Sequence, residues 1–264
     1  MQISQREMEA QCLDKDSLAE AVRQVREVGF VVLEKTMSPA WTETMRVAWE
    51  DHLEGQPADL LSMPFLDPLA IANPWGVQIM DILLGDDYWA RLPYHTNSTA
   101  PNWPDTQEIH RDQRHMFPDL PTLLPPHMLV IHIPLIDFTE ENGSTEVWPG
   151  THLVTDHWET LDPDGGGASG ELEERAMTLP SIRTNMPAGS TLVRDMRVWH
   201  RAVPNHTDQR RTMLSLVYHR HFPSLGYQYK ASDPVDDRIL DQLSERAQRI
   251  YRFSRPEIHG TLDI

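Results

Sequence analysis

Residues 127–136, with the sequence HMLVIHIPLI, narrow the possible folds of this chain more than any other feature. Apolar side chains occur at both odd-numbered and even-numbered positions of the stretch, so a strand formed here would bury both of its faces. Other short β-prone segments, separated by turn residues, lie at 30–33, 94–99, 146–148, 189–194 and 212–219. Many short strands with turns between them are typical of two packed sheets. We therefore expect a mostly β fold with flanking helices, built on a double-stranded β-helix (jelly-roll, cupin-like) core.

Helical signals lie outside these β-prone segments. Residues 16–28 carry apolar side chains at helical spacing, and Asp16 or Ser17 could cap the start of this helix. A second helix is expected over residues 38–53, because a Ser-Pro pair suits an N-cap followed by a first turn. Two further helices are expected at 76–84 and 234–251.

The sequence contains no repeat and no composition typical of a domain linker. We expect a single domain over residues 1–264, with N-terminal helices at about 16–53, a core at about 90–220 and a C-terminal helix at about 234–251. Three connections stand out between these elements: a hairpin-type turn at 140–143, a proline-rich loop at 113–126 and a glycine-rich insertion at 161–175. The two longer connections are expected to be mobile or to act as lids.

Charge and cysteine content exclude several classes of partner. The net charge of −17 argues against binding to nucleic acid or to an anionic membrane surface, because both would repel the chain. The single cysteine, Cys12, cannot form an internal disulfide, as is usual in a reducing compartment. No signal-peptide pattern and no apolar run of about 18 residues is present. We expect a cytoplasmic protein, and the sequence makes no prediction about its oligomeric state.

A His-x-Asp pair, His110 and Asp112, is the first candidate for chemistry. On an extended strand, residues two apart project to the same side, so the imidazole and the carboxylate would lie next to each other. A further histidine from a distant strand would complete a two-histidine, one-carboxylate set, which is diagnostic of non-haem Fe(II) oxygenases. The tripeptide alone is weak evidence, since the chain contains 13 histidines.

Several motifs that follow His-x-Asp in a fixed order strengthen this hypothesis. They are Asn142-Gly143, the turn Pro149-Gly150-Thr151-His152, His200, and Arg211. The ordered set resembles the phytanoyl-CoA dioxygenase (PhyH) family of Fe(II)/2-oxoglutarate-dependent oxygenases. The resemblance extends over most of residues 17–220, but the segments 55–75, 161–175 and the tail after 221 match nothing in the family pattern.

The resemblance implies that His110, Asp112 and His200 ligate iron and that Arg211 binds the distal carboxylate of 2-oxoglutarate. Arginine suits this role because its planar guanidinium binds a carboxylate through two hydrogen bonds. Arg210 is the competing candidate. Strand alternation favours Arg211, because it would share a face with Ser215, which could support the same carboxylate.

The remaining candidates around the site are weaker. His132 lies where some relatives have a residue beside the co-substrate, but it could equally be a buried histidine bonded to a backbone carbonyl. Asn97 could also contact the co-substrate. Four residues could line a substrate pocket or belong to the core: Met116, Phe117, Trp148 and Trp199. Arg111 should point away from its liganding neighbours.

The resemblance further implies that the protein uses Fe(II), 2-oxoglutarate and O2 to oxidise a small-molecule metabolite, releasing succinate and CO2. Hydroxylation is the reaction expected first. Asp112 argues against halogenation, because halogenating relatives lack this carboxylate. Two alternatives stay open: a cupin-like isomerase or hydrolase that uses the metal as a Lewis acid, and a non-catalytic sensor of iron or ketoacid. Net charge favours a small neutral, cationic or amphiphilic substrate over a polyanionic one.

Overall fold

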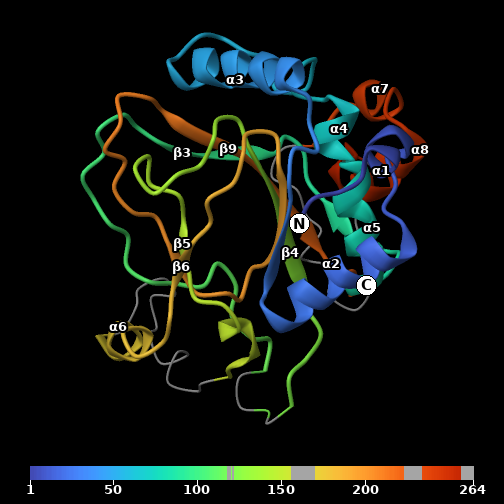
Figure 1. The fold of residues 1–264 in the computed structure, drawn as a ribbon. Coiled ribbons are helices and arrows are strands. Elements are labelled where there is room, and N and C mark those ends of the chain that lie inside the picture. The colour runs from blue at the N-terminus through green and yellow to red at the C-terminus, as the bar shows by residue number, and fades with distance from the viewer. Residues whose placement is uncertain (118–119, 121, 156–169, 223–233, 257–264) are drawn as a thin grey trace.

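The computed structural model describes residues 1–117, 120, 122–155, 170–222 and 234–256. Its strands form two antiparallel sheets (Figure 1). The large sheet has the order β1-β7-β4-β9-β2, with β3 also paired to β9, and the small sheet has the order β6-β5-β8. The strands are β1 (Phe30–Leu33), β2 (Trp89–Ala90), β3 (His95–Thr99), β4 (Met128–Pro134), β5 (Glu146–Val147), β6 (Ile182–Arg183), β7 (Thr191–Asp195), β8 (His200–Arg201) and β9 (Arg211–His219). These facing sheets confirm the expected β fold with flanking helices.

Most helices gather on one side of the large sheet, on the right in Figure 1. The helices are α1 (Gln5–Ala10), α2 (Lys15–Glu27), α3 (Pro39–Leu53), α4 (Pro68–Ile71), α5 (Pro74–Leu83), α6 (Gly170–Ala176), α7 (Asp237–Leu240) and α8 (Glu245–Ile250), with short 3-10 turns η1 (Thr151–Leu153) and η4 (Arg252–Ser254). None of the described helices is both long enough and apolar enough to cross a membrane.

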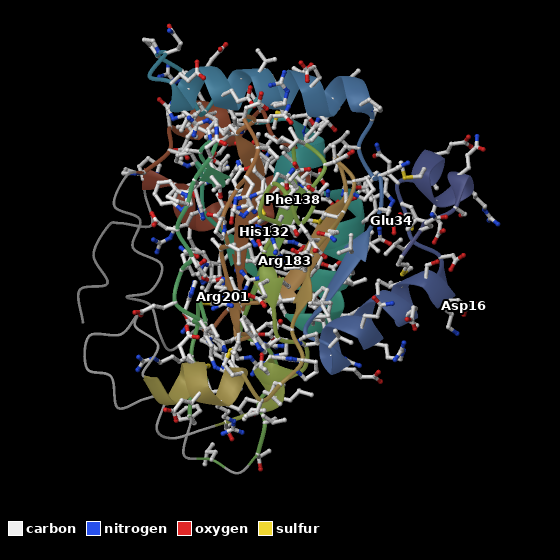
Figure 2. All side chains as sticks on the ribbon, turned by 60° about the vertical axis from the view of Figure 1, so that its left-hand side comes forward. Asp16, Glu34, His132, Phe138, Arg183 and Arg201 are labelled. Carbon is white, nitrogen blue, oxygen red and sulfur yellow. The ribbon has the colours of Figure 1, made fainter. Side chains whose placement is uncertain are left out.

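The main hydrophobic core fills the space between these helices and the outer face of the large sheet. Leu129, Ile131 and Ile133, on alternate positions of β4, belong to it and are fully buried. The intervening residues of β4, such as His132, face the small sheet. In Figure 2 His132 and Phe138 lie over the interior of the molecule, whereas Asp16 and Glu34 lie at its edge. The space between the two sheets contains a cavity lined by both polar and apolar side chains.

The helices predicted at 16–28 and 38–53 form as α2 and α3, but the predicted cap of α2 was wrong. Asp14 caps α2, because its carboxylate accepts hydrogen bonds from the backbone N–H groups of Asp16 and Ser17. Asp16 and Ser17, which the sequence suggested as caps, therefore lie in the first turn of the helix and donate to the cap residue. Ser38 caps α3 as expected, and Pro39 occupies its first turn.

Two of the other predicted helices have different bounds. Helix α5 begins at Pro74 rather than at 76, since the side chain of Asn73 accepts the N–H of Gly76. The single helix predicted over 234–251 is wrong, because the chain forms α7 and α8 with a break between them. Ser244 starts α8 by accepting the backbone N–H of Ala247, and this cap ends any continuous helix.

The turn at 140–143 does not form a hairpin, contrary to the sequence prediction. It leads from β4 in the large sheet to β5 in the small sheet, and these two strands do not pair. Asn142 stabilises the turn, since its side chain accepts the Thr139 N–H and donates to the Asp137 carbonyl. The predicted insertion at 161–175 lies mostly outside the described residues, and only its end appears as α6. Residues 118, 119 and 121 of the predicted lid also lie outside them.

Candidate metal centre and co-substrate cavity

His110, Asp112 and His200 come together in the space between the sheets. One ligand atom from each of the three side chains lies within 4.8 Å of the other two. The Oδ1 atom of Asp112 is 3.5 Å from Nε2 of His200 and 3.8 Å from Nε2 of His110. The sequence hypothesis that these three residues form one cluster is therefore matched by their positions.

The local backbone at His110 differs from the regular strand that the sequence analysis assumed. His110 forms an isolated antiparallel bridge with His200, with N–H···O distances of 3.1 and 3.0 Å, and the chain bends at Asp112. The bridge places the two imidazole rings 4.4 Å apart. The two histidines are thus held together by backbone pairing across the small sheet, and alternation along a strand is not what aligns Asp112 with them.

Backbone carbonyl groups orient both imidazole rings. Nδ1 of His110 lies 2.9 Å from the carbonyl oxygen of Glu108, and Nδ1 of His200 lies 3.1 Å from that of Val198. When Nδ1–H donates to these carbonyls, the lone pair of each Nε2 atom is free to bind a metal. Two imidazole nitrogens and one carboxylate oxygen form a donor set that fits a divalent iron ion.

The charges around the cluster favour the protonation states that a metal requires. Burial would raise the pKa of Asp112, but the positive charge of Arg194 and a hydrogen bond with His200 outweigh it and hold this pKa far below its usual value. Burial, reinforced by Arg194, lowers the pKa of His200 to about 4. At neutral pH the carboxylate is therefore ionised and the imidazole is neutral.

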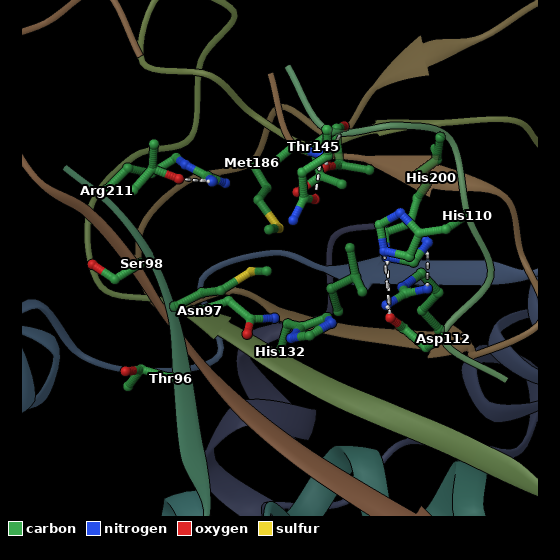
Figure 3. A pocket seen from close by; sticks show the side chains of 18 residues that line it. Thr96, Asn97, Ser98, His110, Asp112, His132, Thr145, Met186, His200 and Arg211 are labelled. Carbon is green, nitrogen blue, oxygen red and sulfur yellow. Dashed lines mark hydrogen bonds and ion pairs between the residues drawn. The ribbon is translucent and has the colours of Figure 1, made fainter. Parts of the chain in front are cut away.

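A cavity of about 380 Å³ extends from the three side chains (Figure 3). The cluster of His110, Asp112 and His200 lies at one end of the cavity and Arg211 at the other. The wall between them is mostly neutral, and it includes Thr145, Met186 and Met213. The cavity thus joins a potential metal site to a buried cation.

Arg211 is only 3% exposed although it carries a charge. Its Nη2 atom donates to the hydroxyl of Thr99, whereas Nε and Nη1 are buried without a partner among the described residues. Burial, together with the nearby charge of Arg183, lowers the pKa of Arg211 to about 10, so the group stays charged at neutral pH. Buried donors of a cation are normally bonded, so unpaired ones indicate a place for an anionic ligand.

The other predicted co-substrate residues divide into two groups. His132 and Asn97 line the cavity, and Figure 3 shows them next to each other between Arg211 and the cluster. Burial and the charge of Arg194 lower the pKa of His132 to about 3, and its Nδ1 atom has no partner in the described part of the chain. Ser215 is buried on β9 but is not part of the cavity wall.

The four residues that the sequence left open between pocket wall and core are not part of the cavity wall. Trp148 and Trp199 are buried in a separate apolar cluster with Ile109, and the indole of Trp148 donates to the Ala176 carbonyl. Phe117 is 55% exposed, and Met116 lines a different cavity.

Arg111 points away from its liganding neighbours, as predicted. Its guanidinium donates to the backbone carbonyls of Thr151 and Val154 and lies 5.1 Å from the ring of Trp199.

Sequence reasoning missed Arg194, which contacts the cluster directly. It lies on β7, is 5% exposed and is 2.5 Å from the Oδ2 atom of Asp112. A signal was present, because an arginine directly after the apolar pair Leu192-Val193 in a strand is unusual when the strand is buried.

Comparisons with known proteins agree with this geometry. A family model described as phytanoyl-CoA dioxygenase (PhyH) matches residues 64–213, more than half of the chain. The dioxygenase andF of Emericella variicolor is 26% identical over 221 residues, which span 79% of this chain and 68% of that protein. The multifunctional dioxygenase ausE of Penicillium brasilianum is 29% identical over 184 residues, 66% of this chain and 56% of that protein.

Solved structures share the fold. The non-haem α-ketoglutarate-dependent carbocyclase SnoK from nogalamycin biosynthesis matches with a TM-score of 0.61 at 20% identity, over 85% of this chain and 94% of that one. The epimerase SnoN from the same biosynthesis matches with a TM-score of 0.58 at 20% identity, over 78% of this chain and 84% of that one.

Proposed function

The chain belongs to the phytanoyl-CoA dioxygenase (PhyH) family, and on that premise we propose that it is a non-haem Fe(II)/2-oxoglutarate-dependent dioxygenase acting on a small-molecule metabolite. Residues 1–264 act as one dioxygenase domain, and we propose that it works in the cytosol. A single observation carries the proposal: two histidines and a carboxylate meet at one end of a cavity whose other end holds a buried, incompletely bonded arginine.

Iron would be held by Nε2 of His110, Oδ1 of Asp112 and Nε2 of His200. Bound iron supplies the centre at which O2 oxidises 2-oxoglutarate to succinate and CO2 and the substrate is oxidised, most simply by hydroxylation. The carbonyls of Glu108 and Val198 hold the Nδ1 protons, so the imidazoles need not lose a proton when the metal binds.

Arg211 orients the co-substrate. Its unpaired Nη1 group donates to the distal carboxylate of 2-oxoglutarate, while the hydroxyl of Thr99 accepts a hydrogen bond from Nη2 and so fixes the plane of the guanidinium. Asn97 and His132 flank the co-substrate between Arg211 and the metal ligands. Burial keeps water from competing for the guanidinium, which strengthens the ion pair. For Ser215 we propose an indirect role, in support of this wall from within β9.

Two kinds of measurement test the proposal. Anaerobic protein loaded with Fe(II) should develop a visible metal-to-ligand absorption band when 2-oxoglutarate is added, and admission of O2 should yield succinate. His200→Ala should lose bound iron, the band and succinate while retaining its fold, because a ligand on a preformed scaffold is not part of its core.

The alternatives predict different results. A Lewis-acid isomerase or hydrolase would bind metal but release no succinate on addition of O2. A sensor would show the absorption band and no turnover with any metabolite of a substrate panel. Full iron occupancy in the His200→Ala protein would show that His200 is not an iron ligand.

A further inference from the structure

Arg194 is a buried arginine whose side chain forms its described hydrogen bonds with residues of the proposed metal centre. It is on β7, whose alternate residues Leu192 and Arg194 line the cavity. Among the described residues, the hydrogen-bond partners of its side chain are Asp112 and His200. By contrast, the equally buried Arg197 binds Asp195 and the carbonyl of Leu124, outside the cavity. Arg194 therefore has contacts that serve the site rather than the fold around it.

Arg194 does not form a hydrogen bond with His200 in the tautomer of His200 that can bind a metal. Nη1 of Arg194 is 3.2 Å from Nδ1 of His200, and the carbonyl of Val198 is 3.1 Å from the same nitrogen. A guanidinium only donates and a carbonyl only accepts, so Nδ1 can bond to one of them at a time. If the lone pair on Nε2 is free, the proton of the neutral imidazole is on Nδ1. Nδ1–H then donates a hydrogen bond to the carbonyl of Val198. The hydrogen bond of Arg194 into the cluster is therefore the one to Asp112.

This bond gives the two carboxylate oxygens of Asp112 different surroundings. Oδ2 is 2.5 Å from Nη2 of Arg194, whereas Oδ1 faces the Nε2 atoms of both histidines at 3.5 and 3.8 Å. An oxygen engaged by a guanidinium is a poor metal ligand, because its lone pairs are directed to the N–H donors. The carboxylate side chain is 29% exposed, so burial alone would not prevent it from rotating.

We propose that Arg194 is a positioning residue that restricts Asp112 to one ligating oxygen, Oδ1, and so keeps a further coordination position open for co-substrate and O2. This inference rests on the proposed function. Arg194 also places a positive charge beside the anion-binding cavity, where it favours a dianionic co-substrate. It disfavours the metal cation for the same reason. Its loss should therefore leave metal binding intact and weaken the binding of 2-oxoglutarate.

The test uses Co(II)-loaded full-length protein without O2, and it compares Arg194→Met with the wild type. The ligand-field absorption of Co(II) reports the coordination number, and it is recorded before 2-oxoglutarate is added. Arg194→Met should shift this spectrum towards a higher coordination number, because Asp112 can then bind through both oxygens. Co(II) affinity should be equal to that of the wild type or tighter, and 2-oxoglutarate affinity should fall at least about tenfold, or ~1.4 kcal/mol.

Arg197→Met is the matched control, since it removes an equally buried arginine that does not touch the cavity. It should lower the melting temperature and leave the Co(II) spectrum and both affinities unchanged. An unchanged spectrum in Arg194→Met would overturn the inference, even with weaker 2-oxoglutarate binding, because a direct contact with the co-substrate would explain that loss. Parallel loss of metal and co-substrate binding would also overturn it. Wild-type protein that binds neither Co(II) nor 2-oxoglutarate would instead refute the proposed function.

Discussion

Arg210 and Arg211 are neighbours in the sequence but have opposite surroundings. Arg211 begins β9, lines the cavity and is 3% exposed. Arg210 is only half-buried, is not part of the cavity wall and acts electrostatically on Glu50 of α3. Of the two neighbours, only Arg211 lines the cavity, which is the side of the chain on which the sequence pattern predicts it.

Substitution of each arginine tests this separation. Arg211→Ala leaves a buried carboxylate without its cationic partner, which typically costs about 3–5 kcal/mol. At roughly 1.4 kcal/mol per decade, 2-oxoglutarate should bind about a hundredfold more weakly or worse. Arg210→Ala should change this affinity by less than about threefold, because Arg210 is not part of the cavity wall and its charge is partly screened by solvent. Both affinities follow from titrating 2-oxoglutarate into anaerobic Fe(II) protein, and loss of binding in Arg210→Ala would show that the assignment is wrong.

The sequence predicts which residues gather at the cavity better than it predicts what surrounds them. His110, Asp112, His200 and Arg211 are proposed because the motifs that carry them resemble those of the family, and all four line one cavity. Arg194 escapes such reasoning, because only the pairing of β7 with β1 and β4 places it near Asp112. Trp199 could have been excluded from the wall by the argument that excluded Arg111, since each is adjacent to a ligand and points to the other side.

At the scale of elements, the turn at 140–143 depends on a contact with a distant connection. Gly143 has a φ of +79°, and a Cβ atom there would lie 2.6 Å from the carbonyl oxygens of both Val203 and Pro204. Those residues belong to the connection between β8 and β9, which carry His200 and Arg211. The turn between the sheets thus packs against the segment that links His200 to Arg211.

Gly143→Ala should be strongly destabilising for two separable reasons. A left-handed φ costs a residue with a Cβ about 1–2 kcal/mol, and overpacking against the two carbonyls adds roughly 1–3 kcal/mol. Gly55→Ala is the control, because Gly55 has a φ of +92° but open space around it. Urea unfolding of both variants measures the difference between them. If the two variants had equal free energies of unfolding, the connection between β8 and β9 would be able to move away from the added Cβ atom without loss of stability.

Local signals explain most elements, and their failures have physical causes. The apolar stretch at 127–136 becomes β4, and Ser38-Pro39 starts α3, because these signals lie within the element itself. The helix predicted over 234–251 is broken because a serine that suits a helix interior poorly can cap a new helix instead. The turn at 140–143 was taken for a hairpin because sheet membership depends on long-range pairing. No local pattern reports that β5 pairs with β8 rather than with β4.

At the scale of the whole molecule, the site joins the two sheets. His200 lies on β8 of the small sheet, and its backbone holds His110 in place. Arg194 and Arg211 lie on β7 and β9 of the large sheet. The apolar core lies on the other face of the large sheet, beneath the helices. Ligands bound in the cavity therefore connect two layers that the main core does not connect.

Metal and co-substrate should accordingly stabilise the folded protein as a whole. Ligand at one hundred times its dissociation constant contributes about 2.7 kcal/mol if it binds the folded state alone. At about 2–4 °C per kcal/mol for a chain of this size, the melting temperature should rise by roughly 5–11 °C. Redox-stable Mn(II) with 2-oxoglutarate allows this measurement in air. His200→Ala should lose the shift caused by the metal, whereas Arg211→Ala should keep it and lose only the increment from 2-oxoglutarate. A His200→Ala protein stabilised as much as the wild type would mean that Mn(II) binds elsewhere, and the link between the sheets would then lie outside this site.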